Sequence, residues 1–341
     1  MLKFLNKYKK FIIAFSFAYV YILVVLLAPS KFTATTPGEI NNVEMQYVIE
    51  DVEIPNNFNV VSVYSWKEIT IFQKWLIQNN QRYALRKQTD FEQNLSLAEY
   101  NLQGRISNQS SHDNAVIAAY TKASKVNNDI KIDYKLNSLT VYYTTNPDLK
   151  IGDEIIEINN REINTNSFED YLTELSIYNE INPNQIFGKN LNLRVLRNGE
   201  QVILTHKLDE GIVFYPNYEI IKTTPSYEGL REQINRGGPS GGMIQALAIY
   251  SGLLNISYKD IVVAGTGTIN TDNSFSVGRI GGLIQKYFTI TDNKVDVFII
   301  PTSHYLEIPD EIKNDFTHII MVDEFDDLIS EFIAIYGDYN D

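Results

Sequence analysis

The segment Arg236-Gly237-Gly238-Pro239-Ser240-Gly241-Gly242-Met243 runs into the apolar stretch IQALAIYSGLL and dominates the pattern of the C-terminal third. Pro239 suits the first position of a helix, and the residues after it are apolar on nearly every face, so we predict a buried helix there. Free N–H groups and the dipole at a helix start favour a developing negative charge. Ser240 is therefore a candidate nucleophile. The alternative is that Ser240 caps the helix and the glycines only shape a loop.

Two later segments extend this pattern. Residues 261–269, IVVAGTGTI, predict a buried strand that runs into a glycine turn, and residues 277–286, VGRIGGLIQK, predict a turn that opens a second helix. In this order, GGPSGG, AGTGTI and VGRIGGLIQK resemble the proteolytic domain of Lon-type serine proteases. They resemble most closely the membrane-anchored branch that joins one N-terminal helix, a PDZ domain and a Lon protease domain. The resemblance is specific over residues 235–301.

The resemblance implies a role for each matching residue. Ser240 falls on the nucleophile of the family and Lys286 on its general base, while Thr266 falls on the threonine that helps to hold the lysine. Backbone groups at Gly241 and Gly238 would support the oxyanion. Lysine, with a free pKa of about 10.4, can activate a serine only where desolvation lowers that pKa.

An apolar setting for the lysine is predicted on the second helix, where four residues form one arc and Lys286 lies off its edge: Leu283, Ile284, Tyr287 and Phe288. The sequence departs from the family at three places. Gly241 replaces the usual alanine, Gly237 replaces an acidic residue of the ATP-dependent members, and bulkier residues follow the lysine. None of these departures removes a catalytic group, so they concern substrate preference and the wall of the site.

The same serine also fits the pattern of a different hydrolase. Gly238-x-Ser240-x-Gly242 satisfies the nucleophile-elbow pattern of α/β-hydrolases, which needs a later acid and histidine, and Asp296 with His304 or His318 could supply them. An elbow follows a buried strand, whereas the stretch before Gly237 is polar, so the sequence disfavours this interpretation.

Several other chemistries are excluded or disfavoured. The chain has no cysteine, which excludes a thiol nucleophile, disulfides and thiolate zinc sites. The four histidines lack close metal-ligand spacing, and the acidic turns at 271–273 and 291–293 do not complete calcium loops. No G-x-x-x-x-G-K-[ST] motif occurs, so we expect no ATP, and we predict neither a metal nor a cofactor. With 42 acidic and 29 basic residues, nucleic acid is not an expected partner.

The N-terminus predicts a membrane anchor. Residues 11–28 carry no charge, four lysines precede them, and the first acid is Glu39. The positive-inside rule then places residues 1–10 in the cytoplasm, a transmembrane helix at 11–29 and the remainder outside the cell membrane. A cleaved signal is the alternative, but Ala28-Pro29-Ser30 is a poor cleavage site.

Between anchor and protease we predict two regions. Residues 30–125 are expected to form a lead-in region, where Ile69, Phe72 and Leu76 have helical spacing that favours core packing and another helix opens near Ser111. Residues 126–207 are expected to form a β-rich module with a helix at 166–178.

This module resembles a PDZ domain. Residues 150–159, KIGDEIIEIN, match the strand-turn-strand of that family, and Asn198-Gly199 predicts a type I′ hairpin turn. PDZ domains bind an extended peptide as an added strand. No glycine-containing carboxylate-binding loop precedes Leu139, so capture of a free C-terminus is not expected. The alternative is a β domain that serves only as a spacer.

The sequence thus predicts an α+β multi-domain protein with a Lon-type proteolytic domain at 208–341. The expected function is a membrane-anchored, ATP-independent serine endopeptidase that cuts peptides or exposed segments of extracytoplasmic or membrane proteins. The second hypothesis is a non-catalytic PDZ scaffold or sensor, and a third is autoprocessing as the main activity. The sequence indicates no oligomeric state.

Overall fold

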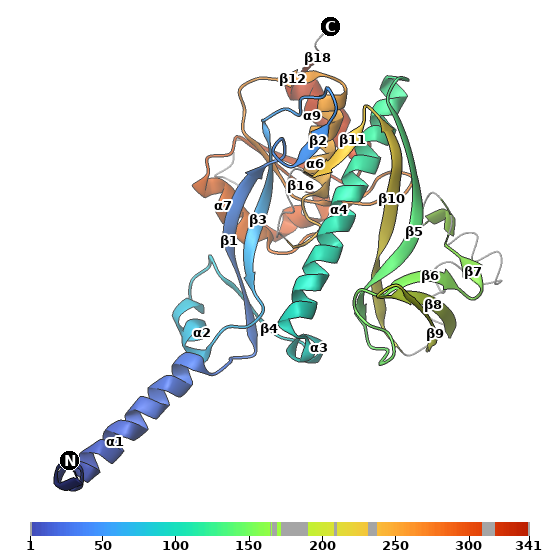
Figure 1. Ribbon diagram of the computed structural model, residues 1–341. Helices are drawn as coiled ribbons and strands as arrows, with labels where there is room; N and C mark the ends of the chain where they lie inside the picture. The colour runs from blue at the N-terminus through green and yellow to red at the C-terminus, as the bar shows by residue number, and fades with distance from the viewer. Residues whose placement is uncertain are drawn as a thin grey trace.

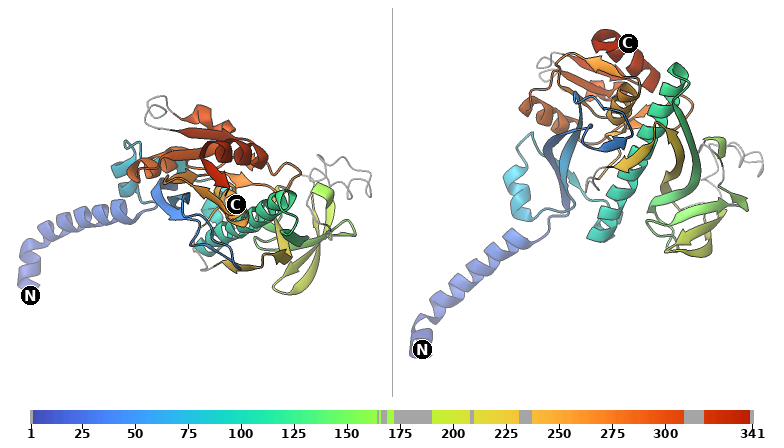
Figure 2. Two further views of the ribbon diagram at one scale, coloured as in Figure 1. Left: turned by 90° about the horizontal axis from the view of Figure 1, so that it is seen from above. Right: turned by 45° about the horizontal axis from the view of Figure 1, so that its top comes forward.

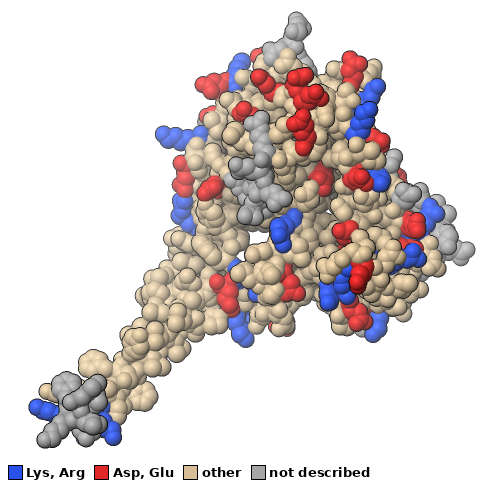
Figure 3. All heavy atoms as spheres, in the orientation of Figure 1, with Lys and Arg blue, Asp and Glu red and all other residues tan. Residues whose placement is uncertain are grey.

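The computed structural model describes residues 2–163, 165, 169–171, 190–207, 210–230, 237–308 and 318–339. Helix α1 (Leu2–Leu27) projects from a body that contains the other elements (Figure 1). Its segment Lys7–Leu27, with a mean hydropathy of 2.3, is long and apolar enough to span a membrane by length and composition. In Figure 3, basic side chains lie at the tip of α1. The rest of the helix, between this tip and the body, carries no charged side chain. This segment includes most of the anchor predicted from the sequence.

A six-stranded mixed sheet organises the body. Its order is β17-β16-β13-β3-β1-β4, with parallel pairing from β17 to β3 and antiparallel pairing of β1 with β3 and β4. The strands are β1 (Phe32–Asn42), β3 (Phe58–Trp66), β4 (Ala84–Lys87), β13 (Val263–Gly265), β16 (Val297–Pro301) and β17 (Ile319–Val322). Three strands therefore come from the predicted lead-in region, which shares one sheet with the C-terminal region instead of preceding it.

Helices cover both faces of this sheet because its strands alternate between two cores. Val263 packs with residues of α6 (Gly242–Leu253) and α9 (Phe325–Tyr336), whereas the next residue, Ala264, packs with α7 (Leu283–Asp292). The predicted buried helix is α6, in which every residue is buried. The first turn of α9 carries Asp326 and Asp327, whose carboxylates suit the dipole at a helix start.

Helix α4 (Leu97–Val126) lies across α6 and separates the main sheet from a second sheet (Figures 1 and 2). It begins at Leu97, well before the predicted start near Ser111. The reason is a capping box in which Ser96 and Glu99 exchange hydrogen bonds, which starts the helix within a polar stretch. A short helix, α3 (Asp90–Asn94), precedes it.

The second sheet has the order β10-β5-β6-β8-β9, with β7 paired to β6. Its strands are β5 (Lys131–Thr144), β6 (Glu154–Ile158), β7 (Arg161–Glu162), β8 (Leu191–Arg197), β9 (Glu200–His206) and β10 (Ile212–Thr224). Asn198 and Gly199 both have positive φ, as the predicted hairpin turn requires. The predicted helix at 166–178 lies mostly outside the described residues.

The ends of this β5–β10 module, residues 131–224, meet. Lys131 pairs with Thr224 at the start of β5 and the end of β10, so the module leaves and re-enters the body at one place. Strand β10 therefore belongs to the module's sheet, beyond the boundary expected at residue 207.

One core prediction is wrong. Helix α2 (Ile71–Ile77) has no buried residue, and Leu76 is 56% exposed, although Ile69 just before the helix is buried. The remaining elements are short: β2 (Tyr47–Ile49), β11 (Tyr227–Leu230), β12 (Ile256–Tyr258), β14 (Thr268–Ile269), β15 (Val277–Gly278), β18 (Gly337–Tyr339) and the 3-10 helix η2 (Thr302–Glu307).

Candidate active site

Ser240 lies in the turn directly before α6. The preceding Gly238 has a φ of +101°, which favours glycine, and the helix is capped at Gly241 without a side-chain hydrogen bond. The Ser240 hydroxyl is therefore not used as a helix cap, and it stands at the N-terminus of a buried helix.

Lys286 meets this serine from the opposite face of the sheet. It lies on α7 and is 2% exposed, and its Nζ is 2.7 Å from Ser240 Oγ and 2.8 Å from Thr266 Oγ1. Thr266 directly follows β13, and its hydroxyl donates to the Ser240 carbonyl oxygen at 3.2 Å. The three residues singled out from the sequence thus form one hydrogen-bonded group.

Burial sets the charge of the lysine. Desolvation lowers the pKa of Lys286 from 10.5 to about 7. Among the described ion pairs none involves Lys286, so no carboxylate opposes this effect. A neutral amine beside a serine hydroxyl can accept its proton.

Backbone donors are available at the same turn. Within the described residues, no hydrogen-bond partner occurs for the N–H groups of Ser240 and Gly241 at the start of α6. The Gly238 N–H, by contrast, donates to the Gly104 carbonyl oxygen at 3.2 Å. Of the predicted supporting positions, Gly241 therefore has a free donor, whereas Gly238 serves the conformation of the turn.

The glycine at position 241 has a steric reason. A Cβ there would lie 2.9 Å from Val60 Cγ1 of β3, closer than packed carbon atoms approach. An alanine at this position would therefore require Val60 or the serine turn to shift.

Helix α4 holds the serine turn from the other side. Ser111 Oγ donates to the Pro239 carbonyl oxygen at 3.0 Å, and a Cβ on Gly104 would lie 3.2 Å from Gly237 Cα. This contact was not predicted from the sequence. The available signal was the spacing of Gly104, Ser107 and Ser111, small residues on one helix face that permit close backbone approach.

Ser240 and Lys286 line a cavity of about 850 Å³ between β3 and α4. Strand β13 pairs with β3 only up to Val60, and residues 61–65 of β3 continue along the cavity wall. On the α4 side the wall includes Tyr100 and Gly104. The cavity therefore runs along a strand edge and ends at the serine–lysine pair.

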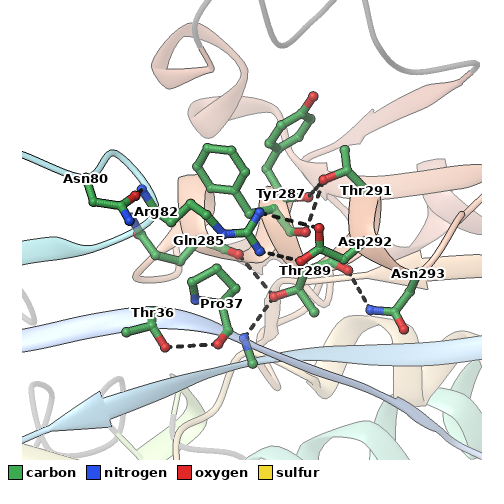
Figure 4. Close-up of polar contacts among 12 residues, drawn as sticks. Thr36, Pro37, Asn80, Arg82, Gln285, Tyr287, Thr289, Thr291, Asp292 and Asn293 are labelled. Atoms are coloured by element: carbon green, nitrogen blue, oxygen red, sulfur yellow. Dashed lines mark hydrogen bonds and ion pairs between the residues drawn. The ribbon is translucent and has the colours of Figure 1, made fainter. Parts of the chain in front are cut away.

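The helix that carries Lys286 is fixed to β1 at its far end. Thr289 Oγ1 accepts from the Gly38 N–H at 3.0 Å and donates to the Gln285 carbonyl oxygen, as Figure 4 shows for Thr289. Arg82 pairs with Asp292 at the end of α7 and lies over the Phe288 ring. Of the predicted apolar arc, Leu283 and Tyr287 are buried, whereas Ile284 and Phe288 are half-buried, and Lys286 itself belongs to the buried side of α7.

The residues of the alternative hydrolase mechanism are engaged elsewhere. Asp296 accepts from the Val262 N–H, His304 accepts from the Ile280 N–H, and His318 contacts the Tyr336 hydroxyl. None of the three lines the cavity that contains Ser240. In the described residues no group of histidines and carboxylates is suited to hold a metal.

Comparison with known proteins adds one finding. Residues 230–335 match the Lon protease (S16) C-terminal proteolytic domain. This match supports a Lon-type protease domain and a serine peptidase. It covers α6, α7 and α9 but not β1, β3 or α4, which complete the site. No curated protein matches the chain.

Proposed function

We propose that this chain is a membrane-anchored, ATP-independent serine endopeptidase in which Ser240 is the nucleophile and Lys286 the general base. The observation that carries the proposal is the 2.7 Å contact between Lys286 Nζ and Ser240 Oγ in a buried setting. The match of residues 230–335 supports the same reaction class.

The reaction follows from this geometry. Neutral Lys286 takes the proton of Ser240 as Oγ attacks the peptide carbonyl, and the N–H groups of Ser240 and Gly241 stabilise the oxyanion. Lys286 then gives its proton to the leaving amine, which leaves an acyl-enzyme. In the second half of the reaction, neutral Lys286 deprotonates a water molecule, which attacks the ester carbonyl. Lys286 then returns the proton to Ser240 Oγ as the acid product leaves. Thr266 positions the amine throughout.

The substrate is proposed to be an extended peptide that enters along β3. Residues 61–65 offer a strand edge beside the cavity, and an edge strand is a template for pairing with another chain. The β5–β10 module, acting as a PDZ domain, would present such segments. With no ATP-binding motif in the sequence, the substrates are peptides, exposed segments or loosely folded proteins.

The location outside the membrane is also part of the proposal. It is supported by α1 and by the lysines that precede its apolar segment.

Separate Ser240→Ala and Lys286→Ala substitutions test the dyad. Each should lower peptide cleavage by roughly four orders of magnitude or more, because the two groups act as a unit. Ser303→Ala and Lys259→Ala, at exposed positions of the same domain, are matched controls that should retain activity. A serine-reactive fluorophosphonate should label the wild type but not Ser240→Ala.

Other outcomes would favour the alternatives. Activity that survives Lys286→Ala but is lost in His304→Ala would indicate an α/β-hydrolase mechanism. Absence of labelling under all conditions would favour a non-catalytic scaffold. A shortened chain that disappears in Ser240→Ala, without cleavage of added peptides, would indicate autoprocessing.

A further inference from the structure

Helix α2 carries an apolar face that the protein leaves uncovered. Ile71, Trp75 and Leu76 are 45%, 63% and 56% exposed, and the Phe72 and Trp75 rings stack with centroids 6.0 Å apart. Positions 71 and 75, and positions 72 and 76, are four residues apart and share one side of the helix. This face has the composition of a core helix but lies outside both cores.

The start of α2 is hydrogen-bonded to the end of α1. The Ile71 N–H donates to the Ala28 carbonyl oxygen at 3.0 Å, and both the N–H and hydroxyl of Ser30 donate to the Ile69 carbonyl oxygen at 2.9 and 2.7 Å. Thr70 caps the helix in a capping box with Gln73. In Figure 1, α2 lies beside the end of α1. The apolar face is therefore held where α1 emerges.

The other side of α2 packs on the protein. Lys74 Nζ lies 3.5 Å from the centroid of the Phe32 ring at the start of β1. The basic residues near α2 have partners within the protein: Arg82 pairs with Asp292 and Arg86 with Glu92, so the feature left uncovered is the apolar face. Ile71, Trp75 and Leu76 are exposed and Phe72 is half-buried beside them, and the interfacial region of a bilayer covers a face of this composition.

We propose that α2 lies in the lipid headgroup region beside α1 and buries Ile71, Phe72, Trp75 and Leu76 in the outer leaflet. Tryptophan favours this depth of a bilayer, and a helix with one apolar face lies in the interface plane. The inference rests on the proposed anchoring by α1. Attachment through two helices instead of one fixes the orientation of the body relative to the membrane.

Fluorescence of the full chain in nanodiscs tests this placement, because Trp66 and Trp75 are its only tryptophans. In Trp66→Phe, emission from Trp75 should shift to shorter wavelength, resist acrylamide and be quenched by brominated lipid. The control adds Val126→Trp to a Trp66→Phe/Trp75→Phe background. Val126 is 61% exposed at the far end of α4, and its replacement should show none of these effects.

A second pair of variants tests the apolar face itself. Leu76→Glu, made in Trp66→Phe, should reduce quenching by brominated lipid without loss of the fold, since Leu76 is exposed. Ile203→Glu is the matched control on β9, where Ile203 is 75% exposed, and should leave the quenching unchanged.

The outcomes separate this inference from the anchoring. One outcome is that acrylamide quenches Trp75 as strongly as it quenches the tryptophan of the Val126→Trp control while the chain still resists carbonate extraction. That result would overturn the placement of α2 but not the anchoring by α1. Extraction of the chain by carbonate would overturn the anchoring and this inference with it. Protection of Trp75 without quenching by brominated lipid would indicate a protein partner and also overturn it.

Discussion

At the scale of single residues, the site depends on what surrounds Lys286. Its amine has two hydroxyl neighbours and no described carboxylate partner, so burial alone lowers the pKa to about 7. A surface lysine would remain protonated at neutral pH and could not accept the serine proton. The apolar packing around α7 is therefore part of the proposed chemistry.

We expect a pH profile that reports this group. Protonated Lys286 is inactive, so kcat/KM should fall about tenfold per pH unit below pH 7 and level off above it.

Thr266 should shift this profile. Its hydroxyl accepts a hydrogen bond from Lys286 Nζ and so favours the charged amine, and Thr266→Val removes this hydrogen bond. The acidic limb should then move to lower pH as the rate falls, whereas Thr266→Ser should restore the profile. Peptide-cleavage rates from pH 5 to 9 measure both effects, and an unshifted limb in Thr266→Val would contradict this role.

A second residue-scale prediction concerns Gly241. Gly241→Ala places a Cβ 2.9 Å from Val60 Cγ1, which should displace the serine turn and lower kcat by about tenfold or more. Val60→Ala alone should have a smaller effect. The double variant should recover activity because it restores the space. Additive losses in this double-mutant cycle would show that the contact does not matter.

At the scale of elements, α4 is a structural support of the proposed site that lies outside the matched domain. Its Gly104 and Ser111 contact the serine turn on the side opposite β3. The turn is thus held between a helix and a strand that both precede the β5–β10 module in the chain.

Gly104→Ala tests this support. In a free helix the change would stabilise by about 0.5–1 kcal/mol, because alanine is the better helix former. Here the new Cβ would lie 3.2 Å from Gly237 Cα, so activity should fall while the melting temperature stays level or rises. Lys125→Ala, at an exposed position of the same helix, is the control. Unchanged kcat in Gly104→Ala would argue against a contribution of α4.

At the scale of the whole molecule, the chain is built as a body with an inserted module. Strands β1 and β3 join β13 in one sheet, while residues 131–224 begin and end as paired strands. Segments far apart in sequence therefore fold together, and the module between them has a sheet of its own.

Two fragments should behave differently. Residues 208–341 alone lack β1 and β3. Phe58 and Val61, both on β3, are fully buried in the full chain. The loss of these two side chains costs about 3–6 kcal/mol of a total stability of about 5–15 kcal/mol, and the fragment also lacks α4, which packs on α6, so it should not fold. Residues 130–225 should fold alone. Circular dichroism with thermal unfolding distinguishes them, and a cooperative transition in residues 208–341 would contradict the shared sheet.

The sequence by itself determined the features that depend on neighbouring residues. The existence of a buried helix after Pro239 and the hairpin turn at Asn198-Gly199 follow from local conformational preferences, although the helix begins at Gly242 and not at Pro239. The order of three motifs indicated Ser240, Thr266 and Lys286 as a group. Only the tertiary structure decided that β3 pairs with β13, that α4 holds the serine turn and that α2 leaves its apolar face uncovered. These features depend on long-range pairing and packing, in which a strand or helix face has the same local pattern whichever partner covers it.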